Sequence, residues 1–141
     1  LSLIYALGPT SVLFGKHIDK ISADKNKGVG TLPVIIGEKA SRYTTMVMWL
    51  AQYLLAGWLV VSGQLGFAVL IVVLAIPKLI STSKVFAKPR PEEEPPGLAP
   101  DTWPLYLSAH AFGYNKRFGS LFLLGLIIDV ALFKAGLTLP V

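Results

Sequence analysis

The chain contains no cysteine, which excludes a disulfide framework, a thiolate metal site and a cysteine nucleophile. It is also poor in charge. Charged residues make up 15% of its 141 residues, against about a quarter in an ordinary soluble domain. Hydrophobic residues make up 53%, and the mean hydropathy is +0.61. Because the apolar residues occur in long runs, this composition indicates an integral membrane protein rather than a water-soluble globule.

Three apolar runs are long enough to cross a hydrocarbon core, which takes about 20 helical residues. The predicted spans cover residues 41–62, 65–81 and 118–137. A fourth run, residues 1–16, is interrupted by Gly8 and Pro9 and has no basic region before it, so it does not resemble a signal peptide. We interpret it as the end of a helix that began earlier. The predicted fold is all-α: a polytopic transmembrane helical bundle with one helix end and three full spans.

The connections between the spans set the predicted topology. Residues 63–66 leave room only for a tight turn, so the first two full spans should form an antiparallel pair. Twelve basic residues then fall on one face of the membrane: Lys16, Lys20, Lys25, Lys27, Lys39, Arg42, Lys78, Lys84, Lys88, Arg90, Lys116 and Arg117. The positive-inside rule makes this face cytoplasmic, in what we expect to be the cell inner membrane. The net charge of +5 therefore reflects topology and attraction to lipid headgroups, and predicts no nucleic-acid partner.

Two polar segments separate these runs. Residues 17–40 are expected to form an aspartate-containing loop on the cytoplasmic side. Residues 82–117 are expected to form a cytoplasmic and interfacial linker, because Pro89–Pro104 is rich in proline and glycine and Trp103–Tyr114 mixes aromatic with polar side chains. Within the last span, Asp129 would cost about 2.5–3.5 kcal/mol to insert, so we expect it to be hydrogen-bonded to a neighbouring helix.

Two carboxylates and two lysines in the first polar segment suggest chemistry. Asp19 and Asp24 lie beside Lys20 and Lys25. Carboxylates can hold Mg²⁺, which takes one or two protein acids together with phosphate oxygens, and lysines can neutralise a diphosphate. On a straight helix the two aspartates would be about 140° apart, so they converge only if the helix ends between them. The alternative is a solvated loop whose charges only fix the topology.

The run from Asp19 to Glu38 resembles the second aspartate-rich motif of the UbiA superfamily of intramembrane prenyltransferases. In that family the motif is followed by a glycine and a Thr-Leu-Pro-like sequence, matched here by Gly28, Thr31–Pro33 and Gly37. The resemblance extends over the whole chain. It implies that the chain begins in the sixth of nine transmembrane helices and ends with the ninth, so that the first aspartate-rich motif is absent.

The resemblance implies transfer of a polyprenyl group from an isoprenoid diphosphate to an aromatic or ring-bearing acceptor, in quinone, chlorophyll or lipid biosynthesis. It implies Mg²⁺ held by Asp19 and Asp24, and diphosphate contacts from Lys20 and Lys25. The expected partners are membrane lipid, the isoprenoid diphosphate, and a missing N-terminal half or partner subunits of a membrane complex. The alternative is a non-catalytic transmembrane subunit derived from this family. The absent first motif would favour it, and so would the aspartate spacing, because the family motif separates its acids by three residues and four residues lie between Asp19 and Asp24.

Overall fold

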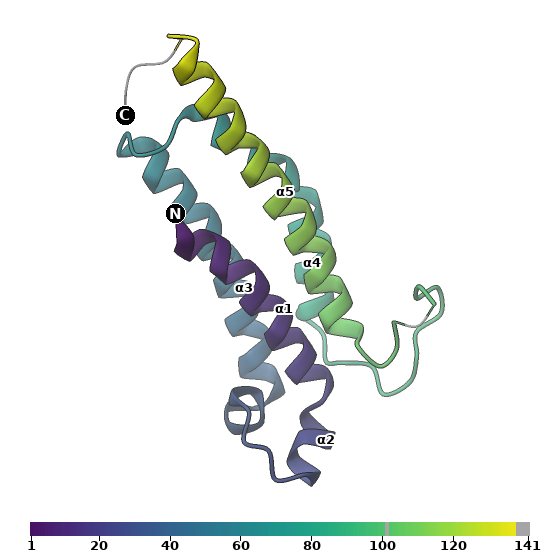
Figure 1. Ribbon diagram of the computed structural model, residues 1–141. Coiled ribbons are helices and arrows are strands. Elements are labelled where there is room, and N and C mark those ends of the chain that lie inside the picture. The colour runs from purple at the N-terminus through teal and green to yellow at the C-terminus, as the bar shows by residue number, and fades with distance from the viewer. Residues whose placement is uncertain (101, 138–141) are drawn as a thin grey trace.

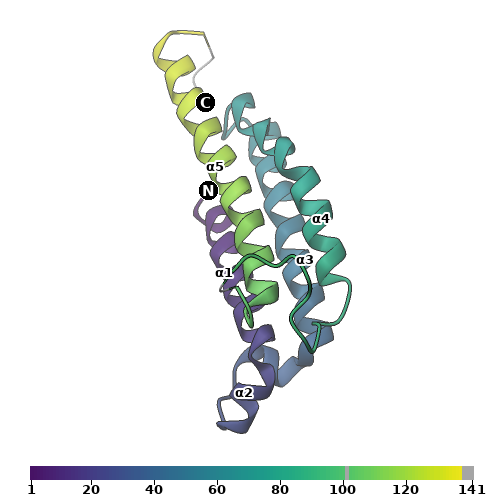
Figure 2. The ribbon, with the colours of Figure 1, turned by 90° about the vertical axis from the view of Figure 1, so that its right-hand side faces the viewer.

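The computed structural model describes residues 1–100 and 102–137, and all regular structure in these ranges is helical. The elements are α1 (Ser2–Asp19), α2 (Ile21–Asn26), α3 (Leu32–Val61), the 3₁₀ helix η1 (Phe67–Ala75), α4 (Ile76–Phe86) and α5 (Tyr106–Lys134). Helices α1, α3, α4 and α5 lie side by side in an elongated bundle, and α2 projects from one end (Figures 1 and 2). The predicted all-α fold is confirmed at this level.

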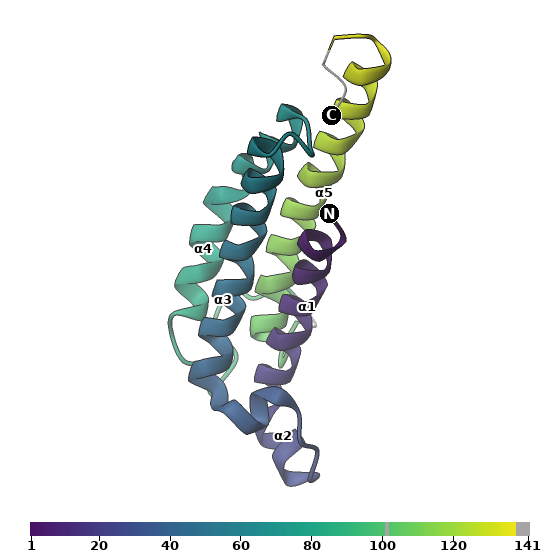
Figure 3. The same ribbon diagram turned by 90° about the vertical axis from the view of Figure 1, so that its left-hand side faces the viewer.

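Among the residues that the structure describes, two segments are long and apolar enough to cross a membrane: Leu32–Val61, and the continuous run of η1 and α4 over Phe67–Phe86. The turn between them brings the second run back along the first (Figure 3). Gly63 adopts a positive φ of 73° in this turn, which glycine tolerates at a helix end. Most of the third expected span, residues 118–137, lies in α5, which ends at Lys134. A bundle of one helix end and three full spans stays a prediction.

The polar segments contain more helix than the sequence suggested. Residues 17–40 include the end of α1, all of α2 and the first turns of α3. In the expected linker, α4 continues to Phe86 and α5 already begins at Tyr106. The early start of α5 has a clear cause, because Leu107, Ala111 and Tyr114 are buried at helical spacing and continue the apolar face of the span.

Small residues allow α1 to approach α5 closely. The buried residues of α1 are Ile4, Gly8, Ser11, Gly15 and Ile18, a stripe along one side of the helix. A Cβ atom added at Gly15 would lie 3.0 Å from the Cα atom of Ser108 at the start of α5. Close backbone approach through small residues is a common way for apolar helices to associate in membranes. This contact places the polar end of α1 directly beside the first turn of α5.

Aromatic and polar contacts join the helices in the middle of the bundle. The ring of Trp49 on α3 lies 4.8 Å from that of Phe86 and 5.0 Å from that of Tyr114. Its indole N–H donates to the Ser11 hydroxyl at 2.9 Å. The Gln52 side chain donates to the Ile4 carbonyl at 3.0 Å and accepts from the Tyr114 hydroxyl at 3.2 Å. Paired polar groups of this kind fix how α1, α3 and α5 are aligned.

Candidate functional site

The two candidate aspartates lie at the end of the bundle from which α2 projects. Helix α1 ends at Asp19, because Lys20 leaves the helical conformation with φ −112° and ψ 9°. The short helix α2 then begins at Ile21 and carries Asp24. The chain therefore has the helix end between Asp19 and Asp24 that their convergence requires. The side chains nevertheless contact different partners.

Asp19 binds the first turn of α5. Its Oδ1 atom accepts the backbone N–H of Leu107 at 3.0 Å, and its Oδ2 atom accepts that of Ser108 at 2.8 Å. The Arg90 guanidinium donates to Oδ1 at 3.2 Å, and the Asp19 side chain is fully buried. Burial raises the pKa of Asp19, and the Ser108 and Leu107 N–H groups and Arg90 partly offset that rise. Its surroundings are those of a carboxylate closing a helix N-terminus.

Asp24 has a different environment. Its Oδ2 atom lies 3.3 Å from Nδ1 of His17, and 16% of its side chain is exposed. The neighbouring Lys20 and Lys25 are exposed, as expected for residues that meet a ligand or solvent. Within residues 1–100 and 102–137, no group of three His, Asp or Glu side chains is arranged to hold a metal ion. Asp19, Asp24 and the two lysines thus lie at the same end of the bundle. Among the described residues, the two aspartates do not form a complete metal centre.

The fit to Mg²⁺ differs between the two aspartates. Both oxygens of Asp19 already accept hydrogen bonds, and the donors are a guanidinium and the positive end of a helix. In this conformation, the Asp19 oxygens are occupied by hydrogen bonds and do not form a site for a cation. Asp24 has a looser set of contacts, a single approach of 3.3 Å to Nδ1 of His17, and Mg²⁺ needs only one or two protein carboxylates when phosphate oxygens and water complete its coordination.

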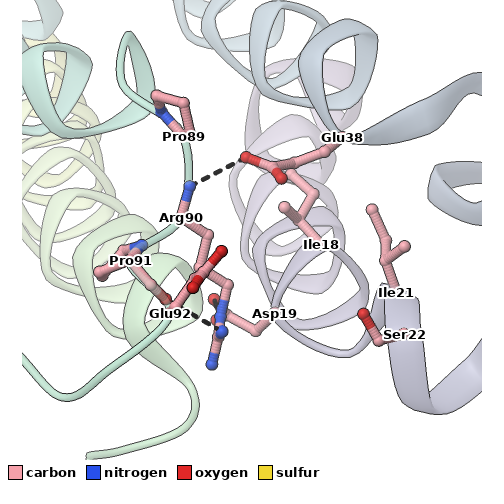
Figure 4. Close-up of a pocket in the computed structure, with 9 residues that line it drawn as sticks. All are labelled: Ile18, Asp19, Ile21, Ser22, Glu38, Pro89, Arg90, Pro91 and Glu92. Atoms are coloured by element: carbon pink, nitrogen blue, oxygen red, sulfur yellow. Dashed lines mark hydrogen bonds and ion pairs between the residues drawn. The ribbon is translucent and has the colours of Figure 1, made fainter.

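Arg90 is a residue that the sequence did not single out. It lies in the linker between α4 and α5, where Arg90 lines a cavity of about 320 Å³ together with Asp19, Ser22 and Glu38 (Figure 4). The Arg90 backbone N–H donates to Oε1 of Glu38 at 2.9 Å, while the side chain reaches Asp19. The guanidinium also donates to the Pro104 carbonyl at 2.9 Å. A single arginine in a proline-rich linker gives no sequence signal for such contacts.

Arg42 and Glu38 complete this polar end. Nε of the buried Arg42 lies 3.1 Å from Oε1 of Glu38, one helical turn away on α3. An Nη1–H group of Arg42 donates to the Phe86 carbonyl at 2.8 Å. Phe86 is the last residue of α4, so the arginine places positive charge at the negative end of that helix. Two of the twelve basic residues, Arg42 and Arg90, therefore hold helices and linker together.

Comparison with known proteins gives one curated relative. Chlorophyll synthase, chloroplastic, from Arabidopsis thaliana is 26% identical to this chain over 89 residues, which cover 62% of this chain and 23% of the relative. The match therefore spans less than a quarter of the length of that relative. No family model matches the chain, and no solved structure matches it. The match agrees with the resemblance to the UbiA superfamily and does not favour the alternative of a non-catalytic subunit.

Proposed function

We propose that this chain is part of an intramembrane prenyltransferase of the UbiA type, which transfers a polyprenyl group from an isoprenoid diphosphate to an aromatic or ring-bearing acceptor. The similarity to chlorophyll synthase carries the proposal. The two helices apolar enough to span a membrane support it. The end of the bundle that bears the aspartates would face the cytoplasm, and the apolar sides of the helices would face lipid of the inner membrane.

The reaction explains why acids and lysines would gather at one end of an apolar bundle. The bond between the prenyl carbon and the diphosphate oxygen breaks, and the diphosphate leaves with the bonding electron pair. The prenyl carbon bonds to the acceptor, and an aromatic acceptor releases to solvent the proton that it carried at the position of the new bond. Lys20 and Lys25 are exposed beside Asp24 and would bind this leaving group. An apolar bundle would hold the prenyl chain and keep water away from the electrophilic carbon.

We assign Asp24 to Mg²⁺, which when bound would neutralise further charge on the diphosphate. Asp19 would join it only by releasing Arg90 and the α5 N–H groups, so its first role in the proposed enzyme is to position α5. The first aspartate-rich motif of the family would supply further ligands from outside this chain. Acceptor specificity would depend on those parts of the protein as well.

Mg²⁺-dependent prenyl transfer by the complete gene product tests the proposal. The Asp24→Ala variant should lose most of the activity, and Lys25→Gln should bind the isoprenoid diphosphate more weakly. Ser22→Ala, also exposed on α2, is the matched control and should retain activity. Activity that survives Asp24→Ala would remove Asp24 from the mechanism. A complete product that binds neither diphosphate nor Mg²⁺ would instead favour a non-catalytic subunit.

A further inference from the structure

The first turn of α3 is set apart from the rest of that helix. Gly37 interrupts the helix with φ 82° and ψ 163°, so residues 32–36 form a short turn with its own direction. Figures 1 and 3 show this turn beside α2, at an angle to the long part of α3. A φ of this sign is accessible to glycine and strained for other residues. The change of direction is therefore built into the chain at Gly37.

This turn and the segment just before it carry four exposed apolar side chains. The exposed fractions are 47% for Val29, 50% for Leu32, 71% for Ile35 and 38% for Ile36. We refer to these four residues as the 29–36 surface. Leu32, Ile35 and Ile36 stand at helical spacing and therefore share one side of this turn, and an exposed apolar patch marks a contact with another apolar phase or partner.

Acids and lysines both lie near the 29–36 surface in the sequence, but the charges without an ion-pair partner among the described residues are all positive. Lys25, Lys27 and Lys39 are exposed, and none of them forms an ion pair with an acid in the part of the chain that the structure describes. The nearby acids are already engaged, Asp24 with His17 and Glu38 with Arg42. An apolar patch with free lysines at its border complements a leaflet of anionic lipid, whose surface offers negative headgroups above an apolar interior.

The length of α3 is consistent with a position of the 29–36 surface at the boundary of the hydrocarbon core. The part of α3 after Gly37 is roughly 36 Å long at 1.5 Å per residue, and a hydrocarbon core is about 30 Å thick. The long part of α3 is therefore sufficient to cross the core, and the turn before Gly37 falls at the cytoplasmic boundary. We propose that the 29–36 surface inserts into the headgroup region of an anionic leaflet and fixes the depth and tilt of α3. This inference rests on the membrane insertion in the proposed function, and not on prenyl transfer.

Because the chain has no cysteine, single-cysteine variants can test the depth of each site. Three variants of the full chain carry a nitroxide label in phosphatidylcholine vesicles with or without phosphatidylglycerol: Ile35→Cys, Asn26→Cys in exposed α2, and Leu54→Cys in the middle of α3. Two reagents collide with the label: oxygen, which is more concentrated in the bilayer, and a nickel chelate, which stays in water. Collision rates with the two reagents therefore report depth.

We expect the label at position 54 to lie deep, the label at position 26 to be aqueous, and the label at position 35 to lie between them. The nickel collision rate at position 35 should be several-fold below that at position 26 in vesicles with phosphatidylglycerol. Lys25→Gln combined with Lys27→Gln should reduce the difference between the two lipid compositions. A change of this kind distinguishes charge complementarity from apolar insertion alone.

Two results at position 35 would overturn the proposal while position 54 remains deep. A label as open to nickel as the one at position 26 would show that the surface faces water. A label shielded from both reagents would show that protein covers it. If the label at position 54 is itself aqueous, α3 does not span the bilayer, and the membrane part of the proposed function fails with this inference.

Discussion

Asp19 at the end of α1 accepts the backbone N–H of Ser108 at 2.8 Å, across 89 positions of sequence, and so closes the N-terminus of α5. The first N–H groups of a helix have no partner within it, and a carboxylate there also meets the positive end of the helix dipole. A residue that the family resemblance assigns to Mg²⁺ therefore has a structural task that requires no metal.

The first prediction separates these two roles. Asp19→Ala should lower the free energy of unfolding by about 1–2 kcal/mol, because three hydrogen bonds to Asp19 are lost and the α5 N-terminus is left open. Asp24→Ala, the matched control, should change stability much less, since within the described residues the Asp24 side chain has one polar contact, to the half-buried His17. Thermal unfolding of the purified chain in detergent, followed by circular dichroism, measures both. Equal losses for the two variants would refute the capping role of Asp19.

A second prediction concerns the linker. Arg90 joins it to Asp19, to Glu38 through its backbone, and to the Pro104 carbonyl, and its guanidinium lies 4.5 Å from the Trp103 ring centroid. Arg90→Gln should therefore release the linker, with several-fold faster cleavage by a glutamate-specific protease at residues 92–94. The free energy of unfolding should fall by less than in Asp19→Ala, because the Leu107 and Ser108 N–H groups still donate to Asp19. Arg117→Gln, an exposed arginine on α5, is the control and should leave the cleavage rate unchanged.

The sequence could predict the structural features that depend on residues close together in the chain, such as helices and turns. The apolar runs and the turn at residues 63–66 follow from local composition, and the structure has helices over these runs and a turn there. The sequence left open whether a helix ends between Asp19 and Asp24, and the structure has that end at Asp19. The sequence could not predict which group Asp19 binds, because Ser108 lies on a helix that begins far along the chain. Arg90 was missed for the same reason. Its partners come from α1, α3 and the start of α5, and no local pattern encodes them.

For Asp129, the sequence predicts that the carboxyl group requires a hydrogen-bond partner, but not which group is that partner. The cost of a carboxylate in an apolar span requires a hydrogen bond, and the Ala68 N–H donates to Oδ1 of Asp129 at 3.0 Å. This N–H belongs to the first turn of η1, so Asp129 closes a helix start as Asp19 does. Gly66 makes the approach possible, because a Cβ at that position would meet the Asp129 carboxyl group.

The third prediction follows from this contact. Asp129→Asn keeps the Oδ1 acceptor and should leave stability close to that of the unaltered chain. Asp129→Ala should be less stable than Asp129→Asn by about 1–3 kcal/mol, because the Ala68 N–H then remains unpaired in an apolar environment. Unfolding of both variants in the same detergent gives the comparison. If the alanine variant equals the asparagine variant, the hydrogen bond does not stabilise η1.

The last prediction concerns how closely α5 approaches η1. A Cβ atom added at Gly125 would lie 2.7 Å from the Cα atom of Val69, a distance at which the backbones must separate. Gly125→Ala should therefore destabilise the bundle by about 1–3 kcal/mol through overpacking. Gly119 on the same helix has open space around the corresponding position, so Gly119→Ala should be neutral or slightly stabilising, because alanine favours a helix more than glycine does. Thermal unfolding of the two variants side by side tests the contact. A Gly125→Ala variant as stable as Gly119→Ala would mean that α5 and η1 do not pack through this glycine.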